Sequence, residues 1–128
     1  MATIHIDTYA GPINPPEIEP EETYYGSFKD SDPPLQLRIA TGGAGQSGLI
    51  KALADAFIDA QAQETGCAPF AVAWLKSDTA GSFNYLAQGS ADLSITYHPA
   101  AEAIAIEQGF VERSVYAWRD HFMLVGPQ

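Results

Sequence analysis

The chain has 128 residues, of which 16 are acidic and 6 are basic, so its formal net charge is −10. This length fits one domain with a buried core. The acidic balance argues against nucleic acid and anionic membrane surfaces as partners, because both attract basic patches. No apolar run reaches 18 residues, so no membrane insertion is expected. The single cysteine, Cys67, excludes an intrachain disulfide and is expected to serve packing.

Residues 1–34 differ in composition from the rest and are predicted to form a proline-rich, acidic N-terminal arm. They hold six of the nine prolines and seven of the sixteen acids. A short edge strand is predicted over Thr3–Asp7, and regular structure is not expected beyond it. Tyr24, Tyr25 and Phe28 favour an arm that packs on the domain, since disordered leaders are poor in aromatic residues.

Residues 35–128 are predicted to form one α/β lobe. Leu35 to Ile39 alternate as in a strand, a glycine-rich turn follows over Thr41–Gly48, and apolar residues then recur at helical spacing. The first helix is expected from Gly48 to Thr65, with Gly66 as its stop.

The alternation of strands and helices continues along the chain. An apolar strand, 70–75, is typical of burial on both faces, and the turn 76–81 leads into a capped helix that ends at Gly89. A strand over 92–97 precedes a helix that starts at His98-Pro99 and ends before Gly109. Two further strands are predicted over 111–118 and 121–125, with Trp74 and Trp118 in the core. This order predicts a parallel-type sheet with helices on both faces.

Three turns are expected to leave strands at the same edge of this sheet, where such folds bind ligands. They carry hydroxyl and amide donors at helix starts, which suit an oxyanion. The candidate anion-binding residues are Thr41, Gly42, Gly43, Ala44, Ser47, Thr79, Ala80, Gly81 and His98. Each turn by itself is also compatible with simple helix capping, and His98 with a cap or a surface residue.

A second interpretation is a dinucleotide-binding oxidoreductase domain, because Gly43–Gly48 matches the fingerprint G-x-G-x-x-G. That fingerprint also requires an acidic residue at the end of the second strand, which here ends at Leu75-Lys76. A phosphate-binding P-loop is excluded by Leu49, which stands where its lysine belongs. The three histidines lack metal-ligand spacing. The turns show no nucleophile–base pair, so no enzyme activity and no cofactor are predicted.

Four ordered blocks resemble the tungstate/molybdate-type solute-binding proteins of ABC transporters. They are Ile39–Leu49, Ala91–Leu93, His98–Glu102 and Asp120–Pro127. In that family the first turn carries several hydroxyl residues before D-S-G and the second reads G-T-G, whereas this chain has Gln46-Ser47-Gly48 and Asp78-Thr79-Ala80-Gly81. The matching contacts are Thr41, Ser47 and Thr79 with their neighbouring amides.

The resemblance implies one lobe of a two-lobe, periplasmic-binding-protein-like fold that clasps tungstate, molybdate, sulfate or phosphate between its lobes. It implies an ABC transporter permease as partner and a periplasmic or extracellular location. The start of the sequence lacks the pattern of a signal peptide, which would leave the protein in the cytoplasm, and both locations stay open. Because the apolar strand 122–125 is followed by only a few residues, the gene product is expected to continue beyond Gln128 by roughly one more lobe.

Overall fold

The computed structural model describes residues 15–34, 36–66, 68–119 and 125–127. Its elements are the strands β1 (Glu22–Tyr24), β2 (Gln36–Thr41), β3 (Ala71–Lys76) and β4 (Leu93–Ser94), the 3-10 helix η1 (Lys29–Ser31), and the helices α2 (Gly43–Gln46), α3 (Leu49–Thr65), α4 (Thr79–Gln88) and α5 (Pro99–Glu107). The predicted α/β class is confirmed. Among the described residues, no helix combines the length and apolar character that a membrane span requires.

The four strands form one sheet in the order β1-β3-β2-β4. β2 runs parallel to β3, with Thr41 opposite Lys76, and parallel to β4, with Ala40 opposite Ser94. These parallel pairs confirm the predicted core of the sheet. β1 pairs antiparallel with β3, so the complete sheet is mixed.

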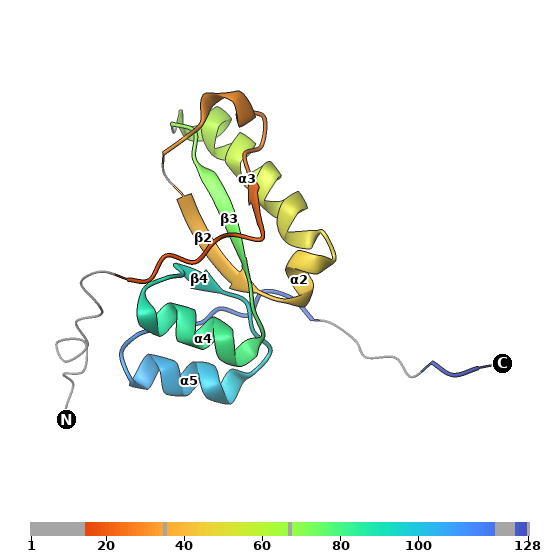
Figure 1. Ribbon diagram of the computed structural model, residues 1–128, viewed down its shortest axis with the longest axis vertical. Coiled ribbons are helices and arrows are strands. Elements are labelled where there is room, and N and C mark those ends of the chain that lie inside the picture. The colour runs from red at the N-terminus through yellow and green to blue at the C-terminus, as the bar shows by residue number, and fades with distance from the viewer. Residues whose placement is uncertain (1–14, 35, 67, 120–124, 128) are drawn as a thin grey trace.

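Helices cover both faces of the sheet, as Figure 1 shows for α3 on one side and α4 with α5 on the other. Since successive strand residues point to opposite faces, β3 sends Val72 and Trp74 toward α3 and Leu75 toward α4. All of β3 before Lys76 is buried, as expected for a central strand. The larger core lies under α3, where Ile50 and Ile58 are almost fully buried.

The helix ends follow the predicted local signals. α3 runs to Thr65, and Gly66 takes the left-handed conformation that ends a helix. Asp78 caps α4, because its carboxylate accepts a hydrogen bond from the Gly81 amide. His98 caps α5 through its side chain, with Pro99 at the first helical position.

The arm packs on the domain, as its aromatic residues predicted, but it also contains regular structure that was not predicted. Tyr24 is only 5% exposed and belongs to the core under α3. The turn after β1 is fastened to α3, because the amides of Gly26 and Ser27 donate to Asp55 and Asp59. Proline and charge density therefore do not prevent a short strand where a partner edge and buried aromatic side chains are available.

Two strand predictions in the C-terminal part are wrong. β4 covers only Leu93–Ser94 of the predicted strand 92–97. Residues 111–118 form no strand, and Trp118 is 41% exposed instead of buried in the core. An alternating pattern makes a segment suitable for a strand, but a strand also needs a partner to pair with. No described strand pairs with this segment. The predictions for Thr3–Asp7, for Cys67 and for nearly all of 121–125 fall outside the described residues.

Candidate functional site

The first two predicted turns and the segment that follows β4 meet at the carboxyl edge of the sheet. The first turn follows β2, and the backbone oxygen of its Thr41 accepts a hydrogen bond of 3.1 Å from the amide of Ser77, in the turn after β3. The Thr41 hydroxyl lies 3.4 Å from the backbone oxygen of Ile95, just after β4. The parallel registry of the three strands produces this convergence, so the expectation from strand order is confirmed.

The glycine-rich turn is more ordered than predicted, because Gly43–Gln46 form the short helix α2. A Cβ atom at Gly42 would lie 2.6 Å from the backbone oxygen of Ser77, and one at Gly45 would lie 2.0 Å from the Trp74 ring. Gly48 has a φ of 85°, which favours glycine. Close contacts or backbone conformation therefore explain why three of the four positions are glycine. At the fourth, Gly43, a Cβ would meet nothing within 4 Å.

Several of the predicted donors already make hydrogen bonds inside the lobe. Thr41 is buried, and its hydroxyl is directed at Ile95. The Ser47 hydroxyl donates to the Ala44 oxygen at 3.1 Å, on an exposed turn. The Gly81 amide donates to the Asp78 carboxylate at 2.6 Å. An incoming ligand would have to replace these bonds to use the same donors.

Other donors at the same edge remain open. The amides of Gly43 and Ala44 stand in the first turn of α2, and those of Thr79 and Ala80 in the first turn of α4. Helix geometry leaves the first amides of a helix without an intrahelical acceptor. Within the described residues these four amides, and the Thr79 hydroxyl, make no hydrogen bond. They are the groups of the predicted set that are available to a ligand.

The third turn is less suited to an anion than its histidine suggested. His98 uses Nδ1 to accept the Ala101 amide at 3.1 Å, which is the role of a helix cap. The Glu102 carboxylate accepts hydrogen bonds from the hydroxyls of Ser114 and Thr96. These two bonds, that of Ser114 foremost, lower the pKa of Glu102. A carboxylate held ionised beside this turn opposes a second negative charge, so the first two turns are the stronger part of the site.

Two features of the edge were not foreseen from the sequence. The Trp74 indole N–H donates to the Thr41 oxygen at 2.7 Å and so fixes the end of β2 against β3. Ser82, which is 1% exposed, shares a hydrogen bond of 2.7 Å with Ser77 and donates to the Asp78 oxygen. Only the short spacing of Ser77 and Ser82 across a helix start hinted at this contact.

The described residues contain no group of three or more histidine, cysteine, aspartate or glutamate side chains that could cage a metal cation. The dinucleotide fingerprint also loses support, because its middle glycine, Gly45, is covered by Trp74 and cannot receive a pyrophosphate. β3 ends at Lys76, without the acidic residue that binds a ribose. The edge is therefore best equipped for hydrogen bonding by amides and hydroxyls.

No family model matches the chain, and no curated protein matches it. It is similar to the solved structure of "a periplasmic putative metal binding protein", with 52% identity and a TM-score of 0.59. The likeness covers 70% of this chain and 29% of that protein, so the chain spans less than a third of its length. That description agrees with the family resemblance as far as a periplasmic binding protein, and it names neither tungstate nor molybdate.

Proposed function

We propose that this chain forms one lobe of a non-enzymatic solute-binding protein and that the turns after β2 and β3 are one wall of its binding site. The observation that carries this proposal is the meeting of two helix starts with open amides at one sheet edge. The similarity to a periplasmic binding protein supports a solute-binding role. A second wall would be needed to enclose the solute and strengthen its binding.

The solute that fits this wall is an oxyanion of the tungstate or molybdate class, with sulfate and phosphate as simpler members. Open amides and the Thr79 hydroxyl donate hydrogen bonds, while the one acidic side chain of the second turn, Asp78, is engaged with Gly81. Molybdenum and tungsten bound as oxyanions need donors instead of carboxylate or histidine ligands. Metal binding by the similar protein is therefore compatible with a wall that lacks a cation cage.

A solute-binding protein of this kind would deliver its ligand to an ABC transporter permease, and it would act in the periplasm or outside the cell. Both statements rest on the family resemblance and on the similar periplasmic protein. The net charge of −10 is compatible with a bound anion, because amides act over a few Å while distant surface carboxylates are screened.

The test is calorimetric titration of the 128-residue protein with molybdate, tungstate, sulfate and phosphate. Thr79→Val should weaken binding several-fold, because it removes an open hydroxyl donor, and Ser47→Ala should weaken it less, because the Ser47 hydroxyl must first give up its bond to the Ala44 oxygen. Ser31→Ala is a matched control for Ser47→Ala. Both hydroxyls are exposed and donate to the backbone oxygen three residues earlier, but Ser31 lies in η1 of the arm.

The proposal is supported if an oxyanion binds with saturable heat, if both site variants weaken this binding, and if Ser31→Ala leaves it unchanged. Binding of NAD, with no binding heat for any of the four anions, would favour the dinucleotide interpretation. A response to zinc or manganese ions alone would instead assign the chain a cation site and overturn the oxyanion proposal.

A further inference from the structure

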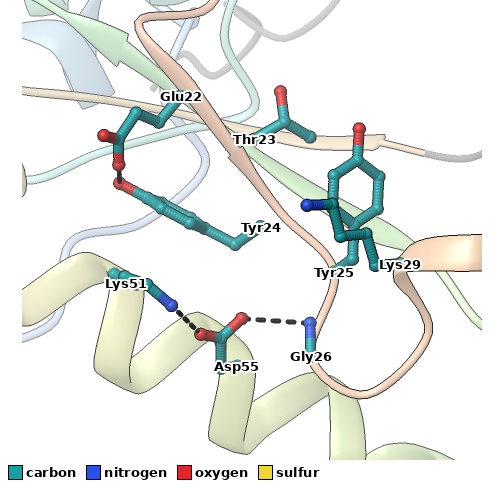
Figure 2. A pocket seen from close by; sticks show the side chains of 8 residues that line it. All are labelled: Glu22, Thr23, Tyr24, Tyr25, Gly26, Lys29, Lys51 and Asp55. Atoms are coloured by element: carbon teal, nitrogen blue, oxygen red, sulfur yellow. Dashed lines mark hydrogen bonds and ion pairs between the residues drawn. The ribbon is translucent and has the colours of Figure 1, made fainter.

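A separate pocket lies at the edge strand β1. It is lined by this strand, by the loop that follows it and by the first turns of α3. It is a depression open to solvent, with a volume of about 340 Å³. Figure 2 shows its lining side chains, which come from the arm and from a helix more than twenty residues away in sequence. None of the turns at the carboxyl edge lines it.

On one side of this pocket the polar side chains already have hydrogen-bond partners within the protein. The Asp55 carboxylate accepts the Gly26 amide at 3.0 Å and pairs with the Lys51 ammonium at 2.6 Å. The Tyr24 hydroxyl donates to Glu22 at 3.0 Å, and the Lys51 ammonium lies 5.9 Å from the Tyr24 ring centroid. Both carboxylates of the pocket are thus occupied, and they hold its wall in place.

The other side carries donors that are not occupied. Thr23, Tyr25 and Lys29 lie together on the side of β1 away from Glu22 and Tyr24 (Figure 2). Among the described residues, neither the two hydroxyls nor the Lys29 ammonium makes a hydrogen bond or ion pair. All three groups can donate to an anion, and the half-buried Tyr25 ring offers a flat apolar surface beside them.

The placement of basic residues singles out this pocket. The chain has only 6 basic residues against 16 acidic ones, yet Lys29 and Lys51 both line it. Lys51 is neutralised by Asp55, which leaves Lys29 as the ammonium of this pocket that pairs with no carboxylate of the described residues. A ligand that supplies one carboxylate and one flat ring matches the free groups in charge and hydrogen bonding, and it adds an apolar surface for the Tyr25 ring.

We propose that this pocket is a second binding site, for a small aromatic carboxylate. Its carboxylate would bind the Lys29 ammonium and the hydroxyls of Thr23 and Tyr25, and its ring would pack on Tyr25. The site is independent of the carboxyl edge, so the two proposals can fail separately.

The experiment is a two-dimensional amide NMR titration of the 128-residue protein with benzoate as the probe. Benzyl alcohol keeps the ring without the charge, and acetate keeps the charge without the ring. Benzoate should give saturable shifts confined to the amides of residues 22–29. Lys29→Gln should weaken benzoate binding roughly tenfold or more, the loss of one charge-assisted hydrogen bond.

Lys76→Gln is the matched control, because Lys76 is also exposed but ends β3 outside the pocket. It should leave benzoate binding unchanged, as should Ser47→Ala at the carboxyl edge. The absence of shifts at residues 22–29, or equal weakening by Lys29→Gln and Lys76→Gln, would overturn the site. Equal binding of acetate or sulfate at these amides would overturn the assignment of an aromatic ligand.

Discussion

Gly45 lies directly against the indole ring of Trp74, so close that a Cβ atom on Gly45 would stand 2.0 Å from ring atom Cε2. The same indole donates its N–H to the Thr41 oxygen at the end of β2. Trp74 therefore joins the central strand to the short helix α2 and sets the position of the first turn of the candidate site.

Replacing Gly45 by alanine is expected to destabilise the protein by about 1–3 kcal/mol, the usual cost of overpacking a buried position. Trp74 is only 5% exposed, so its ring is enclosed by other atoms. Urea unfolding followed by tryptophan fluorescence measures the change. Gly43→Ala is the control, because nothing lies within 4 Å of its added methyl group and stability should stay unchanged or rise slightly. Equal stability of the two variants would disprove the Gly45–Trp74 contact.

The Tyr24 hydroxyl should resist ionisation. Burial, helped by the hydrogen bond to Glu22, raises the pKa of Tyr24 to about 12. Tyrosine in the unfolded chain has a pKa of about 10. Above that pH the unfolded state loses its proton first, so the contribution of Tyr24 to stability is complete below about pH 10 and is lost as the pH approaches 12.

Unfolding free energies of the wild type and of Tyr24→Phe, measured between neutral pH and pH 12, test this. Their difference should decline across the alkaline range, whereas Tyr97→Phe, at a residue 83% exposed, should run parallel to the wild type. Phenolate absorbance of the folded protein provides a direct check. A Tyr24 hydroxyl that ionises near pH 10 would contradict the prediction.

The ion pair between Arg38 and Asp92 should stabilise the protein at neutral pH and lose this effect in acid. Asp92 accepts two guanidinium bonds, of 2.8 and 3.1 Å, and the Arg38 amide at 2.9 Å. The hydrogen bond from the Arg38 side chain lowers the pKa of Asp92. A lowered carboxyl pKa contributes stability above the unfolded value, near 3.9, that disappears as the pH falls through the folded value.

Asp92→Asn should therefore cost up to about 1 kcal/mol at pH 7, since both partners are about one-third exposed and solvent screens the pair. The difference in unfolding free energy between the wild type and Asp92→Asn should disappear in strong acid. Glu112→Gln, at an exposed carboxylate outside this pair, serves as the control and should change little. A gap that persists at low pH would show that packing, not charge, explains the loss.

The arm should loosen when its attachment to α3 is removed. Asp59 accepts both the amide and the hydroxyl of Ser27, at 2.8 and 2.9 Å. Asp59→Ala should increase proteolysis and amide exchange over residues 22–31, at a cost of about 1–2 kcal/mol. Glu64→Ala, on the same helix but outside this contact, should leave both measurements unchanged. Exchange that rises equally throughout the lobe would indicate global unfolding instead.

The sequence by itself determined the features that depend on neighbouring residues. Helical spacing and caps located α3, α4 and α5 to within about a residue, because capping groups and periodicity act over one or two turns. The apolar run 70–75 marked the central strand, observed over Ala71–Lys76, and strand order located the edge where the turns meet. These inferences required no knowledge of distant contacts.

Only the tertiary structure decided the features that depend on partners far along the chain. Residues 22–24 became a strand because β3 offers an edge and α3 covers Tyr24, while 111–118 alternate just as well but pair with no described strand. Gly45 belongs to a ligand fingerprint in sequence, yet it faces Trp74, 29 positions later. Strand pairing and close packing are set by residues distant in sequence, so local patterns leave them undetermined.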